Sequence, residues 1–144
     1  MHSQKIIDCI TFFDNNFMFE LRYNILKDYV DYFVVCESKF DHKGNEKGKN
    51  FVFKKNFNLK KIKYFYLEKP FPENNDGWKN QAIQREFLLE SLKFASKDDY
   101  VFFSDPDEIP NPKLLINFEL KKKYGIFFQD CFNYKFNLFN PYET

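Results

Sequence analysis

The chain lacks any long hydrophobic run. No apolar stretch among its 144 residues approaches the roughly 20 residues that a membrane-spanning helix needs, and no small-residue cleavage site of a signal peptide follows Met1. Net charge is also nearly absent, since 22 basic residues face 21 acidic ones. Such a chain has no strong field with which to attract nucleic acid or an anionic membrane. We therefore expect a soluble, cytoplasmic protein with no nucleic-acid partner and no membrane span.

Histidine and cysteine are scarce as well. His2 and His42 fall at a terminus and in a polar loop, so we expect both to be exposed. Cys9, Cys36 and Cys131 are odd in number and lack metal-ligand spacing, which indicates reduced, buried thiols. Without a histidine ligand set or a recognisable nucleophile, metal-assisted hydrolysis of phosphate esters is a poor fit.

Aromatic residues, in contrast, are abundant. They make up 22% of the sequence, with 21 Phe and 9 Tyr, which is far more than a disordered chain carries. The length suits one domain of ordinary size and not two. We expect a single domain over residues 1–144, and the aromatic surplus leaves open a homo-oligomer with a covered apolar surface.

Apolar, β-branched segments alternate with helical patterns along the chain. Strands are expected at residues 5–13, 31–38, 61–68 and 100–103, with one or two more between 124 and 139. Helices are expected at residues 17–29 and 78–95, and from Pro112 to about residue 123. This alternation predicts an α/β fold with a mostly parallel sheet flanked by helices.

An acidic turn directly follows the strand expected at residues 100–103. Asp105 and Asp107 are two residues apart, so both side chains project the same way from extended backbone. The turn lies where ligands of open α/β sheets bind, outside the carboxyl end of a strand. Two close carboxylates repel unless a cation neutralises them, and hard oxygen ligands suit Mn²⁺ or Mg²⁺. The alternative is an ordinary capped turn, because Asp is common in turns and near helix starts.

Two arginines fall on apolar arcs of the expected helices. Arg22 lies near the middle of its arc, where it needs a partner such as Glu37. Arg85 shares an arc with Trp78 and Leu89 and is expected to point inward. A buried arginine pairs with a carboxylate of the protein or with a ligand anion, and the sequence leaves both open.

Five sequence blocks follow one another in an order that is more specific than an Asp-x-Asp motif alone. They are Asp8-Cys-Ile-Thr-Phe-Phe-Asp14, Glu20-Leu-Arg-Tyr-Asn-Ile-Leu26, Val30-Asp-Tyr-Phe-Val-Val-Cys-Glu-Ser38, Gln84-Arg85 and Ser104-Asp-Pro-Asp-Glu-Ile-Pro-Asn-Pro112. Together they resemble glycosyltransferase family 17, over nearly the whole chain. The resemblance implies a GT-A type nucleotide-diphospho-sugar transferase fold. It also implies transfer of a sugar with inversion, N-acetylglucosamine from a UDP-sugar donor, to a glycan acceptor.

The resemblance also implies roles for individual residues. Asp105 and Asp107 are expected to hold Mn²⁺ or Mg²⁺. The donor contacts are expected from Thr11, Phe12, Phe13, Glu37, Gln81, Arg85 and Asp105. Family members extend well past residue 144, so acceptor contacts and the general base of an inverting transfer are expected outside this chain, and no catalytic residue is assigned. The alternative function is a non-catalytic module that binds a nucleotide sugar or a glycan.

Overall fold

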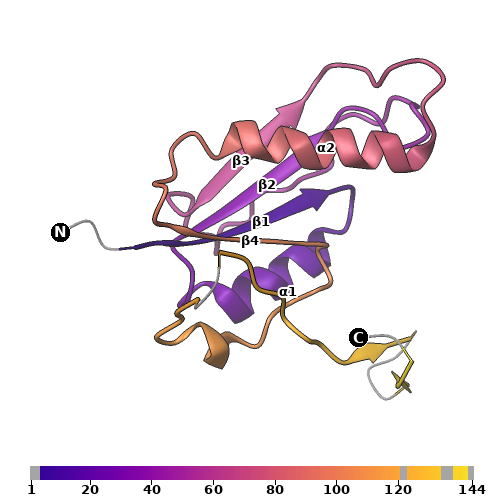
Figure 1. The fold of residues 1–144 in the computed structure, drawn as a ribbon. Coiled ribbons are helices and arrows are strands. Elements are labelled where there is room, and N and C mark those ends of the chain that lie inside the picture. Colours follow the sequence, from indigo (N-terminus) through magenta and orange to yellow (C-terminus); the bar gives the residue numbers. More distant parts are fainter. Residues whose placement is uncertain (1–3, 121–122, 134–137, 143–144) are drawn as a thin grey trace. The chain divides into compact units, whose positions relative to one another are not determined.

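The computed structural model describes residues 4–120, 123–133 and 138–142 (Figure 1). The chain groups into two compact units, Met1–Asp107 and Glu108–Thr144, which are described in turn. A single domain over residues 1–144 stays a prediction. No helix in the described part of the chain combines the length and the apolar character needed to cross a membrane.

The first unit contains a four-stranded parallel sheet with a helix on each face. Its strands are β1 (Ile6–Phe12), β2 (Tyr32–Ser38), β3 (Ile62–Leu67) and β4 (Tyr100–Ser104), in the spatial order β3-β2-β1-β4. Helix α1 (Asn16–Leu26) and helix α2 (Gly77–Ser91) lie on opposite faces of this sheet (Figure 1). The predicted α/β class with a parallel sheet flanked by helices is therefore confirmed.

The two central strands form the core of the first unit. All residues of β1 after Ile6 and all residues of β2 after Tyr32 are buried, because each strand has neighbours on both edges and a helix on each face. Side chains alternate between the faces. On the α2 face the buried cluster consists of Ile7, Cys9, Val34, Cys36 and Leu88. On the other face, the ring of Phe33 packs against Phe19 of α1.

Helix α2 buries a face that hydrophobicity did not predict. Its buried residues are Asn80, Gln84, Leu88 and Ser91. Trp78 and Leu89, which were expected to share an inward arc with Arg85, are 81% and 69% exposed. The predicted orientation of this helix is therefore wrong. A polar stripe can be buried here because Asn80 and Gln84 find hydrogen-bond partners in the segments that they cover.

The second unit has little regular structure in its described residues. It contains a short 3₁₀ helix, η1 (Pro112–Leu115), and an antiparallel pair of strands, β5 (Cys131–Phe132) and β6 (Phe139–Asn140). The helix expected from Pro112 to residue 123 is wrong beyond Leu115, because Ile116 is already extended, with φ −73° and ψ 121°, and Asn117 has a φ of 55°. Residues 121–122 lie outside the described part. Of the described residues between 124 and 139, where one or two further strands were expected, only those of β5 and the first residue of β6 are strand.

Candidate functional site

The carboxyl ends of β1 and β4 lie side by side. The parallel register pairs Ile10 of β1 with Ser104 of β4, so the residues that follow both strands reach the same edge of the sheet. From β1 the chain continues to β2 on one side, whereas β4 lies on the other. Ligands of open α/β sheets bind at such a reversal of strand order. The acidic turn after β4 occupies this position.

The side chain of Arg22, in helix α1, binds backbone carbonyl groups of the acidic turn. Its Nη1 donates to the carbonyl oxygens of Asp105, at 3.1 Å, and of Pro106, at 3.3 Å. Its Nη2 donates to Ser104 Oγ at 2.8 Å. The same guanidinium donates to both carboxylate oxygens of Asp8 in β1, at 2.6 and 2.8 Å. One buried side chain thus ties together the first strand, the first helix and the turn after the fourth strand.

The sequence analysis missed Asp8 as the partner of Arg22. It suggested Glu37 or another acid, and the structure identifies that acid as Asp8. A signal was present, because Asp8 is the one acid within an otherwise uncharged strand, Ile6–Phe12. A carboxylate in a strand buried on both faces must find a cation or several donors. A lone charge in such a run therefore predicts a buried pair even when the partner is unknown.

Arg85 of helix α2 binds the acidic turn through the side chain of Asp105. Its Nη2 lies 2.7 Å from Asp105 Oδ1, and both side chains are 39% exposed. Its guanidinium carbon lies 5.7 Å from the centroid of the Phe103 ring, within cation–π range. Arg85 is therefore half-buried, and the structural alternative, a pair with a carboxylate of the protein, is the one that the structure contains.

Asp107, two residues after Asp105, is exposed. Among the described residues, no group of three or more His, Cys, Asp and Glu side chains could hold a metal ion by itself. Two carboxylates on one turn nevertheless fit Mn²⁺ or Mg²⁺, because such ions are commonly bound by one or two carboxylates and complete their shell with phosphate oxygens and water. The donor chemistry of Asp105 and Asp107 is compatible with that arrangement.

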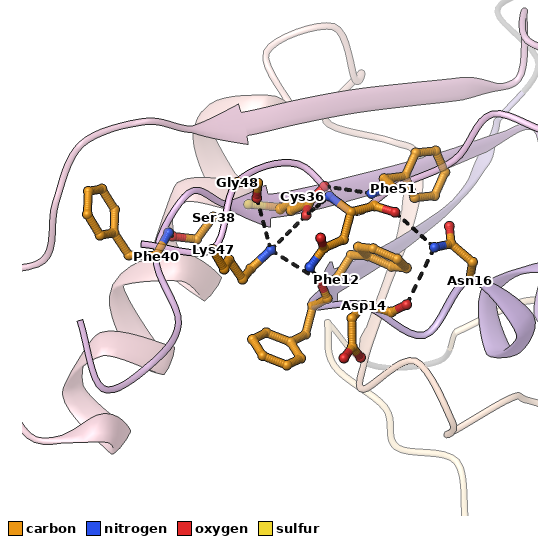
Figure 2. A network of polar contacts seen from close by, with 12 residues as sticks. Phe12, Asp14, Asn16, Cys36, Ser38, Phe40, Lys47, Gly48 and Phe51 are labelled. Carbon is orange, nitrogen blue, oxygen red and sulfur yellow. Dashed lines mark hydrogen bonds and ion pairs between the residues drawn. The ribbon is translucent and has the colours of Figure 1, made fainter. Parts of the chain in front are cut away.

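Glu37, near the end of β2, lies inside a network of protein donors that includes Lys47 and Phe51, both labelled in Figure 2. Its Oε1 accepts from Lys47 Nζ and the Asn50 amide, each at 2.7 Å. Its Oε2 accepts from Tyr64 OH at 2.7 Å and the Phe51 amide at 3.1 Å. Glu37 is completely buried, so its carboxylate anchors the loop of residues 39–53. A direct contact between Glu37 and a donor stays a prediction.

The same loop reaches back to the end of β1. Lys47 Nζ and Asn50 Nδ2 both donate to the carbonyl oxygen of Phe13, at 3.1 Å. Phe13 is 50% exposed, whereas Thr11 and Phe12 are buried. Of the three residues predicted to border the nucleotide, Phe13 is therefore the one that presents side-chain surface at this edge.

Gln84 connects helix α2 to the carboxyl ends of the central strands β1 and β2. Its Nε2 donates to the carbonyl oxygens of Cys36, at 3.0 Å, and Phe12, at 3.4 Å. Its Oε1 lies 2.9 Å from His42 Nε2, so the expectation that His42 is exposed is wrong. Gln81, one turn earlier, is half-buried, and its predicted contact with the donor is untested. His2 lies outside the described residues.

The chain is an α/β protein whose parallel sheet carries a carboxylate turn where the strand order reverses. Proteins of this class bind ligands at that position. Comparison narrows the class, because residues 1–125 match glycosyltransferase family 17. The chain is a member of that family. No solved structure matches it.

Two curated relatives are similar to the chain over much of its length. They are the β-1,4-mannosyl-glycoprotein 4-β-N-acetylglucosaminyltransferases of Rattus norvegicus and Homo sapiens, each 30% identical over 120 residues. The matched region covers 74% of this chain and 22% of each relative. The chain thus corresponds to about a fifth of the length of these relatives.

Proposed function

We propose that the chain is the donor-binding part of a metal-dependent, inverting glycosyltransferase with a GT-A type fold. Its donor is UDP-N-acetylglucosamine and its acceptor is a glycan. Family membership supports the transferase class, and the names of the two relatives support N-acetylglucosamine as the transferred sugar. The observation that carries the proposal is the position of the acidic turn, at the carboxyl edge of the sheet where the strand order reverses.

In this proposal Asp107 and Asp105 hold Mn²⁺ or Mg²⁺, which when bound offsets the negative charge of the diphosphate leaving group. Arg22 keeps the turn in place through the backbone carbonyls of Asp105 and Pro106. These bonds to backbone oxygens do not involve the carboxylates of Asp105 and Asp107, so they need not break when a cation is bound. Positioning of this kind is a large part of catalysis, because a misplaced charge stabilises the transition state less.

The nucleotide end of the donor meets the end of β1. The exposed side chain of Phe13 stacks on the uracil base, whereas the buried Thr11 and Phe12 act through the backbone. Lys47 and Asn50 steady this segment by donating to the Phe13 carbonyl. Glu37 supports the donor site indirectly in this arrangement, because it holds both of those residues.

Isothermal titration calorimetry with UDP-N-acetylglucosamine tests the proposal. We expect binding with Mn²⁺ present and none after chelation, and Asp107→Ala should abolish it. Asp98→Ala is the matched control, because Asp98 is an exposed acid just before the opposite end of the same strand and should bind normally. Binding that is unaffected by chelation, or by Asp107→Ala, would contradict the proposal.

A second candidate is a non-catalytic module that binds a nucleotide sugar. Release of UDP in the presence of a panel of glycan acceptors separates the two candidates. Turnover above the rate without acceptor supports the transferase, whereas binding without any release supports the module.

A further inference from the structure

The two arginines that hold the acidic turn differ in how firmly they are fixed. The side chains of Arg22 and Asp8 are 0% and 1% exposed, and Arg22 donates to the backbone carbonyls of Asp105 and Pro106 and to the Ser104 hydroxyl. Arg85 and Asp105 are each 39% exposed. A buried pair resists separation because each charge would be stranded away from water. A half-exposed pair exchanges far more easily, because water compensates both charges.

Arg85 also has hydrogen-bonding capacity that the protein does not use. Its Nε is buried and donates to no acceptor within the described residues. Its Nη2 donates to Asp105, while its guanidinium carbon lies 5.7 Å from the centroid of the Phe103 ring. A guanidinium presents five donors in a flat fork that matches the oxygens of phosphate. An arginine with an unsatisfied donor beside a carboxylate turn is thus suited to bind a second anion.

We propose that Arg85 is an exchangeable counter-ion: it neutralises Asp105 while no divalent cation is bound, and moves to the donor's diphosphate when a cation takes its place. This inference rests on the proposed function, because it requires a cation at the turn and a diphosphate beside it. The physical reason is that two cations cannot share one carboxylate without repulsion, whereas the diphosphate brings new negative charge to the same place. Arg22 does not take part, because its bonds to Asp8 and to the backbone remain.

The exchange predicts opposite effects on two affinities. Arg85→Gln removes one cationic competitor for Asp105, so the chain should bind Mn²⁺ alone about two- to fivefold more tightly, the range expected for release of one half-exposed ion pair. The same variant should bind UDP at saturating Mn²⁺ on the order of tenfold more weakly, because a charge-assisted contact to phosphate is lost. A fixed structural role for Arg85 predicts no gain in metal affinity.

The experiment measures free Mn²⁺ by electron paramagnetic resonance and UDP binding by calorimetry, using the whole 144-residue chain. Arg85→Lys keeps the charge and loses the fork, so it should bind Mn²⁺ alone like the unmodified chain and bind UDP more weakly. Lys79→Gln is the control for lost positive charge, because Lys79 is exposed on the same helix and should change neither affinity. Circular dichroism checks that each variant is folded.

The possible results are distinguishable. Tighter Mn²⁺ binding with weaker UDP binding in Arg85→Gln supports the exchange. Unchanged or weaker Mn²⁺ binding in Arg85→Gln, in a chain that otherwise binds UDP with Mn²⁺, overturns the exchange and leaves the proposed function standing. If neither the unmodified chain nor Arg85→Gln binds Mn²⁺, the proposed function and the exchange are both overturned.

Discussion

Arg22 donates a hydrogen bond to each carboxylate oxygen of Asp8, at 2.6 and 2.8 Å, and both side chains are almost completely buried. This pair lies between helix α1 and strand β1, and it is the base from which Arg22 reaches the backbone of the turn after β4. Two of the three buried charged side chains among the described residues therefore position the candidate site.

Breaking this pair from one side should be costly. Arg22→Met leaves the Asp8 carboxylate buried without its cation, so we expect the free energy of unfolding to fall by about 3 to 5 kcal/mol. Urea unfolding followed by circular dichroism measures the loss. Trp78 fluorescence is less suitable, because that side chain is 81% exposed in the folded chain.

Two further variants serve as controls for the stability loss in Arg22→Met. Lys39→Met breaks the exposed pair between Lys39 and Glu46 and should cost less than about 1 kcal/mol. The double variant Asp8→Leu with Arg22→Met should recover part of the stability, because no buried charge is left unpaired. Equal losses for Arg22→Met and Lys39→Met would show that the buried pair contributes no more to the free energy of unfolding than the exposed pair does.

Glu37→Gln tests the anchor of the loop. The amide keeps the shape of Glu37 but removes the charge that faces Lys47 Nζ at 2.7 Å, so we expect a loss of about 3 kcal/mol. Hydrogen exchange at the amides of Asn50 and Phe51, which donate to Glu37, should accelerate more than exchange in β1. Glu46→Gln is the exposed control in the same loop, and exchange that changes equally in both variants would contradict the anchor.

Substitutions of Gln84 and Gln81 should affect different properties: the first should lower folding stability, and the second should weaken donor binding. Gln84→Ala removes the hydrogen bonds to the carbonyl oxygens of Cys36 and Phe12 and the contact with His42, with an expected cost of about 1 to 3 kcal/mol. Gln81→Ala should change the free energy of unfolding by less than about 0.5 kcal/mol and should weaken UDP-sugar binding instead. Urea unfolding and calorimetry on both variants test this pairing, which fails if Gln81→Ala is the more destabilising.

Alkaline pH should destabilise the fold through Cys36. Burial and the neighbouring Glu37 carboxylate raise the pKa of the Cys36 thiol to about 12. Above about pH 9 the unfolded chain releases this proton while the folded chain retains it, so stability falls as pH rises. The slope is about 1.4 kcal/mol per pH unit for one such group.

The measurement is urea unfolding in reducing buffer between pH 8 and 11, a range of about three units chosen to span this window. Cys36→Ala should lower stability at pH 8 because of the small cavity, yet show a shallower decline at higher pH. The thiol of Cys9 and the hydroxyl of Tyr64 also have a raised pKa, chiefly because of burial, and should account for the decline that remains. An identical slope with and without Cys36 would contradict the assignment.

Local pattern predicted the elements better than their orientation. The strands expected at residues 5–13 and 31–38 correspond to β1 and β2, because two-sided burial produces a continuous apolar run. The buried face of α2 was wrong, because Asn80 and Gln84 are buried by partners that lie 38 and 48 residues away. No local periodicity contains information about such partners.

The sequence by itself determined the α/β alternation, the acidic turn after the fourth strand of the sheet and the family to which the chain belongs, because these depend on residue type and order along a short stretch. Only the tertiary structure decided that Arg22 pairs with Asp8, that Glu37 is enclosed by the loop it anchors, and that Arg85 reaches Asp105. Charges choose partners by distance and burial. Those quantities exist only once the parallel strands have brought distant segments to one edge of the sheet.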